Sequence, residues 1–256
     1  MTRVIALAGK GGTGKTTIAA LIIQNLVQRG LGPVLAIDAD PATNLHMALG
    51  LATPATVGEV REEMMETAQA GQLGVSISRH DHLSREIRLA VEEGEQIDLL
   101  AMGRPEGQGC YCAVNHLLRT VIDDLGRNYP LVVIDNEAGM EHISRRTTKD
   151  VDQLLVVTDP TVRGLRAAGS IAELAKDVEV NVRRTNLIVN RVTGPLSPML
   201  RSVIDELGIE LAGMIPADES VGELDAQGQA LVSLNGDSPA AEAVSGLTTR
   251  ILTSFS

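Results

Sequence analysis

Residues 9–17, with the sequence GKGGTGKTT, constrain the fold of this chain more than any other stretch. The β-branched apolar run 4–8 before them predicts a buried strand, and the apolar run 18–27 after them predicts a helix. Glycines let successive backbone N–H groups point inward, and the N-terminus of a helix adds partial positive charge. The spacing matches the P-loop pattern G-x-x-x-x-G-K-[ST] at every position, so the sequence predicts a phosphate cradle between a strand and a helix.

The side chains at the end of this loop indicate a nucleoside triphosphate with Mg²⁺. Lys15 supplies a positive charge for the β- and γ-phosphates, and the hydroxyl of Thr16 can bind Mg²⁺. We expect further ATP contacts from the rest of the loop, namely Gly11, Gly12, Thr13, Gly14 and Thr17.

A dinucleotide site is the sharpest alternative. Gly9, Gly11 and Gly14 also match the G-x-G-x-x-G fingerprint, and Asp38 lies where a ribose-binding acid would be expected. A dinucleotide fold has no use for a lysine and a threonine at positions 15 and 16, or for a later acid at a strand end such as Asp135. The sequence therefore favours the triphosphate.

Carboxylates end two further predicted strands. Asp38 and Asp40 end the strand 33–38, and Asp135 ends the strand 131–135. Ligands of open α/β sheets bind beyond the carboxyl ends of the strands, where these carboxylates can orient a water molecule and a metal ion. Asp135 is the carboxylate expected on the Mg²⁺ side of a P-loop ATPase. The alternatives are that Asp40 caps the helix that follows it and that Asp135 is a plain turn residue.

Strand and helix patterns alternate along the chain, which predicts an α/β fold with a single doubly wound, mostly parallel sheet and helices on both faces. We expect one domain over 1–256, with a polar surface excursion over 79–112. The predicted strands are 3–8, 33–38, 75–78, 97–102, 131–135, 153–158, 186–190 and 211–214. The predicted helices are 15–29, 56–69, 113–127, 163–177, 197–207 and 239–252.

The charge of the chain limits its partners. The formal net charge is −11, which argues against non-specific binding to nucleic acid or to anionic lipid. The sequence has no apolar run of the ~18 residues that a membrane span needs, and its first apolar run stops at Lys10. We therefore expect a cytoplasmic protein that binds neither nucleic acid nor membrane.

Cys110 and Cys112 are the only cysteines, and they directly precede the predicted helix 113–127. A helix N-terminus favours thiolates, which are metal ligands. Burial as small hydrophobic residues and a redox C-x-C disulfide are the alternatives. Two thiolates leave a four-coordinate site incomplete, so either His116 and water or a second copy of the chain would complete it. Four thiolates suit Zn²⁺, or Ni²⁺ in a planar arrangement.

Two late strand ends are expected beside the nucleotide base. Asn190 and Arg191 end the strand 186–190, and Pro216 follows the strand 211–214. The amide of an asparagine offers both a donor and an acceptor to the edge of adenine.

The loop 9–17 resembles the deviant P-loop of the MinD/ParA/nitrogenase-iron-protein class, whose hallmark is an extra lysine, here Lys10. The resemblance implies a MinD-like P-loop NTPase fold of the SIMIBI class, in which this lysine reaches the phosphates of the other subunit across an ATP-bridged dimer. Asp40 matches the switch I residue that positions the attacking water, and 135–139 resembles switch II. Asn190 matches the asparagine that contacts adenine in this class.

Within that class, Cys110-Tyr111-Cys112 and the stretch 138–142, AGMEH, are similar to the accessory ATPases of carbon monoxide dehydrogenase, the CooC/AcsF type. That similarity implies nickel binding by the cysteines at a dimer interface and nickel loading into carbon monoxide dehydrogenase or acetyl-CoA synthase. Asn136 and Glu137 differ from the small residues expected in switch II.

The expected function is an ATP-dependent metallochaperone. Two subunits would close around ATP, and Cys110 and Cys112 of both would form one metal site. Lys10 and Lys15 would stabilise the phosphate charge, Thr16 and Asp135 would hold Mg²⁺, and hydrolysis would open the dimer. The alternatives are a positioning ATPase that binds DNA or membrane, and a reductase-like ATPase with an iron–sulfur cluster between subunits.

Overall fold

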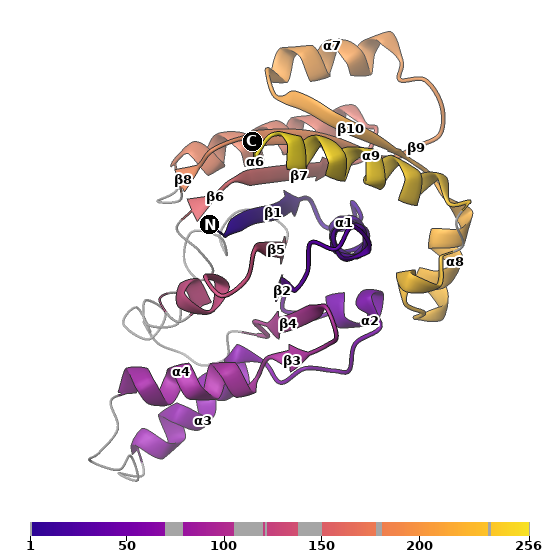
Figure 1. Cartoon of the computed structure of the whole chain (residues 1–256). Coiled ribbons are helices and arrows are strands. Elements are labelled where there is room, and N and C mark those ends of the chain that lie inside the picture. The colour runs from indigo at the N-terminus through magenta and orange to yellow at the C-terminus, as the bar shows by residue number, and fades with distance from the viewer. Residues whose placement is uncertain are drawn as a thin grey trace.

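The computed structural model describes residues 2–69, 79–104, 120, 122–137, 150–177, 181–234 and 237–255. Its centre is an eight-stranded sheet with the order β10-β9-β7-β1-β5-β2-β4-β3 (Figure 1). All neighbouring strands in it are parallel except β3, which pairs antiparallel with β4 at one edge. The strands are β1 (Arg3–Gly9), β2 (Val34–Ala39), β3 (Glu92–Glu93), β4 (Ile97–Ala101), β5 (Leu131–Asn136), β7 (Gln153–Thr158), β9 (Thr185–Val192) and β10 (Glu210–Pro216).

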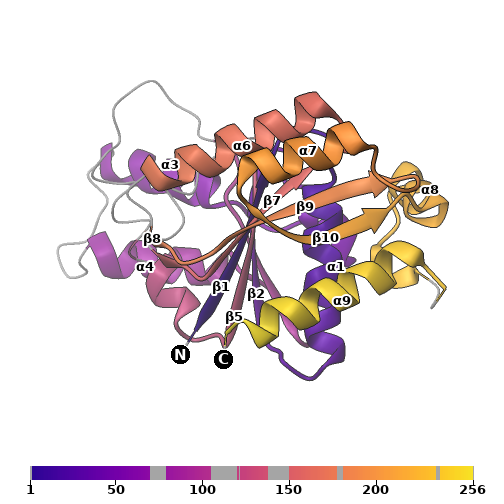
Figure 2. The same ribbon diagram turned by 90° about the horizontal axis from the view of Figure 1, so that it is seen from above.

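Helices cover both faces of this sheet. The described helices are α1 (Lys15–Gln28), α2 (Leu45–Leu49), α3 (Val57–Gln69), α4 (Arg79–Leu89), α6 (Val162–Asp177), α7 (Pro198–Leu207), α8 (Glu219–Gln227) and α9 (Pro239–Thr253), with a 3-10 turn η2 (Leu231–Ser233). Figure 2 shows α6 and α7 on one side of the sheet and α9 on the other. The α/β architecture with a mostly parallel, doubly covered sheet, as the sequence predicts, is confirmed.

Strand β1 shows why the apolar runs of this chain are continuous. Ile5 and Leu7 pack into the core beneath α1 and α9, whereas Ala6 and Ala8 pack into the core on the α6 side. Successive side chains of a strand point to opposite faces, so a strand covered on both sides must be apolar at every position. This central position of β1 places the loop that follows it at the carboxyl edge of the sheet.

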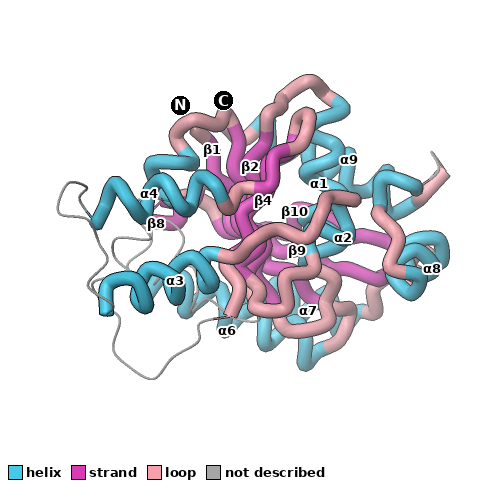
Figure 3. The backbone as a smooth tube through the Cα atoms, turned by 90° about the horizontal axis from the view of Figure 1, so that it is seen from below, coloured by secondary structure: helices cyan, strands magenta, loops and turns pink. Residues whose placement is uncertain are grey.

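The range 79–112 differs from the predicted surface excursion in its described part. Residues 79–89 form α4, which packs beside α3 (Figures 1 and 3) and buries Leu83 and Ile87 completely, at 0% exposure. Strand β4 follows and pairs with β2 inside the sheet. The two buried residues of α4 are four positions apart, which places them on one helical face. The stretch still suggested a surface excursion, because charged residues dominate its composition.

Other predicted elements agree within a few residues, and some are new. Residues 75–78 lie outside the described part of the chain, and of the helix 113–127 the structure describes residue 120 and the helical residues 122–126. Helix α8 and the small sheet of β6 (Asp150–Val151) and β8 (Asn181–Val182) were not predicted, since short polar segments carry no periodic pattern. Among the described residues, no helix is both long and apolar enough to cross a membrane.

Candidate active site

Hydrogen bonds within the glycine loop stabilise its conformation between β1 and α1. The hydroxyl of Thr13 donates to the carbonyl of Lys10 at 2.9 Å, and the backbone N–H of Thr13 donates to the same oxygen at 3.4 Å. Gly14 directly precedes α1 with φ of +88°, a left-handed conformation that glycine adopts without strain. The loop therefore delivers the chain to the first turn of α1, where backbone N–H groups lack helical partners.

Lys15 lies at the start of α1 and is 7% exposed. Its ammonium donates to the carbonyl of Lys10 at 3.3 Å, which is a neutral acceptor. An ammonium has three donors, so Lys15 retains donors for phosphate oxygens. Lys10 itself is exposed.

A cavity of about 580 Å³ opens beside this loop, within the size range of ligand sites. Of the residues predicted from the sequence, its wall contains Gly11, Gly12, Gly14, Lys15, Thr16, Thr17, Asp40 and Arg191. Its other lining residues were not predicted, and they are Asn44, Met47, Ala48, Glu137, Asp225, Gly228, Gln229 and Leu231. The predicted residues Lys10, Thr13, Asp135, Asn190 and Pro216 are not among the lining residues. Apart from Glu137, which follows β5, the missed wall comes from α2 and its N-cap, from the end of α8 with the loop after it, and from η2, which contacts both helices.

Asp135 ends β5 with a carboxylate that is 1% exposed and has no hydrogen-bond partner on either oxygen. Burial raises the pKa of Asp135 to about 7, and the nearby Thr16 hydroxyl and Lys15 ammonium lower it only in part. Two carboxylate oxygens without a hydrogen-bond partner, beside a threonine hydroxyl, are the hard oxygen donors that Mg²⁺ prefers. Asp135 and Thr16 therefore fit an Mg²⁺ site.

Asp38 holds the loop that carries Asp40. One of its oxygens accepts from the backbone N–H of Asp40 at 3.1 Å, and the other accepts from that of Leu45 at 2.9 Å. Burial raises the pKa of Asp38 to about 6, although both hydrogen bonds lower it. Asp40 accepts from the N–H of Ala42 at 2.9 Å, within the loop rather than in the first turn of α2, and lies on the cavity wall.

The end of β9 contacts the glycine loop from the other side. The Asn190 side-chain amide donates to the carbonyl of Thr13 at 2.8 Å, and Arg191 donates to the carbonyl of Gly12 at 3.0 Å. Pro216 ends β10, the neighbouring strand at the edge of the sheet. The predicted contact of Asn190 and Pro216 with the base remains a prediction.

Asn136 and Glu137 follow Asp135 directly. The Asn136 amide donates to the carbonyl of Leu7 at 2.7 Å, which ties the end of β5 to β1, while its side-chain oxygen is buried without a partner. Glu137 lies on the cavity wall. The predicted switch II thus begins at a strand end that Asn136 ties to β1, and its next residue, Glu137, lies on the cavity wall.

The predicted metal ligands lie outside the described residues. This applies to Cys110, Cys112 and His116, and also to the stretch 138–142 of the predicted switch II. In the part of the chain that the structure describes, no group of three or more His, Cys, Asp or Glu side chains is arranged to hold a metal ion.

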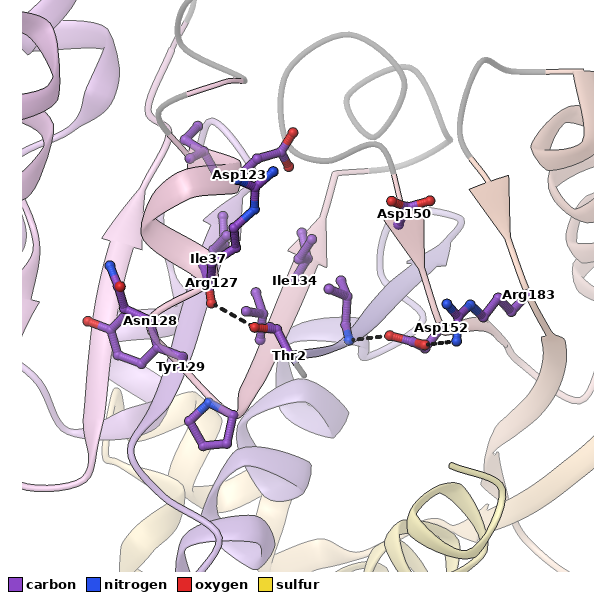
Figure 4. Close-up of a pocket in the computed structure, with 15 residues that line it drawn as sticks. Thr2, Ile37, Asp123, Arg127, Asn128, Tyr129, Ile134, Asp150, Asp152 and Arg183 are labelled. Atoms are coloured by element: carbon purple, nitrogen blue, oxygen red, sulfur yellow. Dashed lines mark hydrogen bonds and ion pairs between the residues drawn. The ribbon is translucent and has the colours of Figure 1, made fainter. Parts of the chain in front are cut away.

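A second cavity, of about 710 Å³, lies near the amino ends of β1 and β5 (Figure 4). One of its lining acids, Asp152, accepts from the N–H of Val4 at 2.9 Å and pairs with Arg3 and Arg183, each at 3.1 Å. Two guanidinium groups compensate this one carboxylate, so Asp152 ties β1 to the neighbouring segments. The first cavity, whose wall contains most of the predicted residues of the glycine loop, is the candidate site.

The geometry of a phosphate loop facing two strand-end acids can now be compared with known proteins. The family model described as "CobQ/CobB/MinD/ParA nucleotide binding domain" matches residues 4–232. The chain belongs to this family.

Relatives and solved structures agree with that membership. An ATP-binding protein of Methanocaldococcus jannaschii is 40% identical over 231 residues, which span 90% of this chain and 91% of that protein. The carbon monoxide dehydrogenase accessory protein CooC of Rhodospirillum rubrum is 32% identical over 244 residues, 90% of each chain. The cell division ATPase MinD of Pyrococcus furiosus has the same fold, with a TM-score of 0.69 over 99% of both chains at 22% identity.

The predicted resemblance to the MinD/ParA class, with similarity to the CooC type, is thereby confirmed. As a member of the CobQ/CobB/MinD/ParA family, the chain is a P-loop ATPase with ATP as its nucleotide.

Proposed function

We propose that this ATPase is a metallochaperone that supports nickel insertion into carbon monoxide dehydrogenase or acetyl-CoA synthase. The observation that carries the proposal is its 32% identity to CooC along 90% of both chains. Cys110 and Cys112 supply the second support, because thiolates are ligands for Ni²⁺ and Zn²⁺. A cytoplasmic location and the absence of nucleic-acid and membrane partners belong to the same proposal.

The ATPase chemistry divides among side chains at the carboxyl edge of the sheet. Lys15 holds the β- and γ-phosphates, and Asp40 orients the attacking water from the cavity wall. Thr16 and Asp135 would hold Mg²⁺, which would neutralise charge on the phosphates. Lys10, exposed in the single chain, reaches the phosphates of a second subunit and stabilises their developing charge.

A homodimer formed with ATP completes the metal site. Each chain contributes Cys110 and Cys112, and a two-fold axis turns two thiolates into four. Hydrolysis removes the phosphate contacts that join the subunits, so the thiolates separate and the metal is released to its client. Zn²⁺ competes for the same thiolates.

A nickel titration tests this proposal. Equilibrium dialysis of the full chain with NiCl₂ and a non-hydrolysable ATP analogue should give one nickel per two chains. Cys112→Ser should lose this nickel, whereas Met199→Ser, an exposed change on α7, should retain it. One nickel per single chain in every nucleotide state would contradict the shared site.

The client is tested with a trapped dimer. Asp40→Asn should bind ATP without hydrolysing it and remain dimeric, so a client that recognises the ATP-bound dimer should co-purify with it. A monomer under these conditions would contradict the role of Asp40. Colourless protein from anaerobic purification would argue against an iron–sulfur cluster between subunits.

The positioning-ATPase alternative needs a surface for DNA or membrane. Helix α9 offers no such anchor, because Val244, Leu247 and Ile251 are buried against the sheet and α1. ATP-dependent pelleting with liposomes or DNA would favour the alternative, and no pelleting would favour the metallochaperone.

A further inference from the structure

We propose that Asn190 and Arg191 form a clamp that positions the P-loop backbone for phosphate binding. We define the clamp as these two side chains and the carbonyl groups of Gly12 and Thr13 to which they donate. It belongs to the ATPase site itself, so it does not depend on which metal or client the chain serves.

Asn190 supplies the buried half of the clamp. Its side-chain amide donates to the Thr13 carbonyl at 2.8 Å, a buried contact between residues 177 positions apart, and the residue is 7% exposed. Gly14 lies against it so closely that a Cβ at this position would collide with the Asn190 amide nitrogen. A glycine with φ of +88° is therefore required where β9 approaches the loop.

Arg191 supplies the exposed half. Its backbone has φ of +58°, a left-handed conformation that is unfavourable for a non-glycine residue. This conformation accompanies a guanidinium that donates to the Gly12 carbonyl at 3.0 Å. Backbone strain of this kind persists where surrounding contacts impose it, often at functional sites.

The clamp fixes the direction of the loop's peptide groups. In a trans peptide the C=O and the following N–H point in opposite directions. Because Asn190 holds the Thr13 carbonyl toward β9, the N–H of Gly14 points away from β9. The Gly12 carbonyl is likewise held by Arg191. Carbonyl oxygens that turned toward the cavity would repel phosphate oxygens, so the clamp keeps acceptors out of the cradle.

This role differs from recognition of the base by Asn190. The Asn190 amide is already bound to the loop, and the residue is not among those that line the cavity. Loss of a base contact would change the preference for ATP over GTP. Loss of the clamp would weaken the binding of both nucleotides equally, since both carry the same triphosphate.

The test compares Asn190→Leu with Asn186→Leu by titrating each variant with Mg·ATP and Mg·GTP. Leucine is uncharged and similar in size to asparagine but cannot donate to Thr13. Asn186 is the matched control because it lies on the same strand, is also buried, at 8% exposure, and is not among the residues lining the cavity. Asn190→Leu should raise the Kd for both nucleotides by about tenfold, which corresponds to ~1.4 kcal/mol, with the ATP to GTP ratio unchanged.

A changed ATP to GTP ratio would overturn the clamp in favour of base recognition. Unchanged Kd values, or an equal loss in Asn186→Leu, would also overturn it. Asn190→Ser, which is smaller and cannot reach Thr13, replaces the leucine variant if that variant does not fold, and the same outcomes apply.

Arg191→Gly and Arg191→Ala separate the side chain from the backbone. Both remove the guanidinium, and only glycine also removes the left-handed strain. Both variants should raise the Kd for ATP and the Kd for GTP by the same factor, roughly three- to fivefold. The glycine variant should unfold at a higher denaturant concentration than the alanine variant. Wild-type affinity in Arg191→Gly would overturn the part of Arg191 in the clamp. In the double variant of Arg191→Ala and Asn190→Leu, the factor by which Kd rises should be smaller than the product of the two single factors, because both side chains act on one loop.

Discussion

Asp38 and Asp135 occupy matched positions on neighbouring strands, since each is paired with the other in the register of β2 and β5. Both are 1% exposed, and burial raises the pKa of each. Their hydrogen bonding differs completely. Asp38 accepts two backbone N–H groups from its own loop, whereas neither oxygen of Asp135 has a partner.

The difference separates a structural acid from an acid that awaits a ligand. The hydrogen bonds of Asp38 fix residues 40–45, and they hold Asp40 at the cavity. Thr16 and Lys15 compensate the burial of Asp135 only in part, and burial is costly for a charged group. Such a carboxylate is stabilised only by a proton or by a cation brought with the nucleotide.

The largest expected effect is on hydrolysis by Asp135→Asn. This change keeps the shape of the side chain and removes its charge, so Mg²⁺ loses a ligand. We expect kcat/KM for Mg·ATP to fall by about 10²- to 10³-fold, the range for loss of one preorganised charge-stabilising group. Asp124→Asn, a change at an exposed acid paired with Arg127, should retain wild-type activity. A wild-type kcat/KM in Asp135→Asn would contradict the role of Asp135 as a ligand of Mg²⁺.

The next effect is on how the free energy of unfolding of the nucleotide-free protein depends on pH. The unfolded carboxyl groups lose their protons near pH 3.8, whereas the folded ones retain them to about pH 6 at Asp38 and about pH 7 at Asp135. The folded state thus binds more protons in this window, and stability must fall as pH rises. We expect the free energy of unfolding to decrease by about 2–4 kcal/mol between pH 5 and pH 8, measured by denaturant titration.

Asp135→Asn should remove the larger share of that decrease. The same titrations on Asp124→Asn should reproduce the wild-type slope. A wild-type stability that rises over this range would mean that both acids are compensated in the folded protein.

A smaller effect distinguishes the two acids by their hydrogen bonds. At pH 5, where both are mainly protonated in the folded state, Asp38→Ala leaves the N–H groups of Asp40 and Leu45 without their acceptor. Asp135→Ala removes the interactions with the side chains of Thr16 and Lys15 but leaves no backbone N–H group without the acceptor that Asp38→Ala removes. We expect Asp38→Ala to be less stable than Asp135→Ala by about 1–2 kcal/mol in denaturant titrations. The reverse order would contradict the assignment of Asp38 as the structural acid.

Asn136 has one satisfied and one unsatisfied polar group in the same side chain. Its amide N–H donates to the carbonyl of Leu7, and its side-chain oxygen has no partner. Asn136→Ala loses the hydrogen bond but also removes the buried oxygen, so the two effects oppose each other. We expect a loss of stability below about 1 kcal/mol by thermal denaturation. A loss as large as that of Asp38→Ala would show that the tie between β5 and β1 matters more than the orphaned oxygen.

The parts of the site that follow a local pattern could be predicted from the sequence. The glycine loop, Lys15 and Thr16 are consecutive, and Asp38 and Asp135 end apolar runs that must be buried strands. These runs also predict the central sheet, because a strand covered on both faces has no polar positions.

The remaining wall of the cavity could not be predicted in this way. Asp225, Gln229 and Leu231 come from a short polar helix, the loop after it and a 3-10 turn, which carry no periodic signal. They reach the cavity only because η2 packs against α2, a contact between distant segments. The clamp at Asn190 also depends on a long-range contact, whereas its residue type alone suggested only a contact with the base.

The most direct test of the contrast between the two acids compares unfolding of wild type and Asp135→Asn at pH 8. Without ligand, Asp135→Asn should be the more stable protein, because it avoids a buried charge. With Mg²⁺ and a non-hydrolysable ATP analogue the order should reverse, and EDTA should restore it. If the ligand stabilised both proteins equally, Asp135 would not be the acid that awaits the cation.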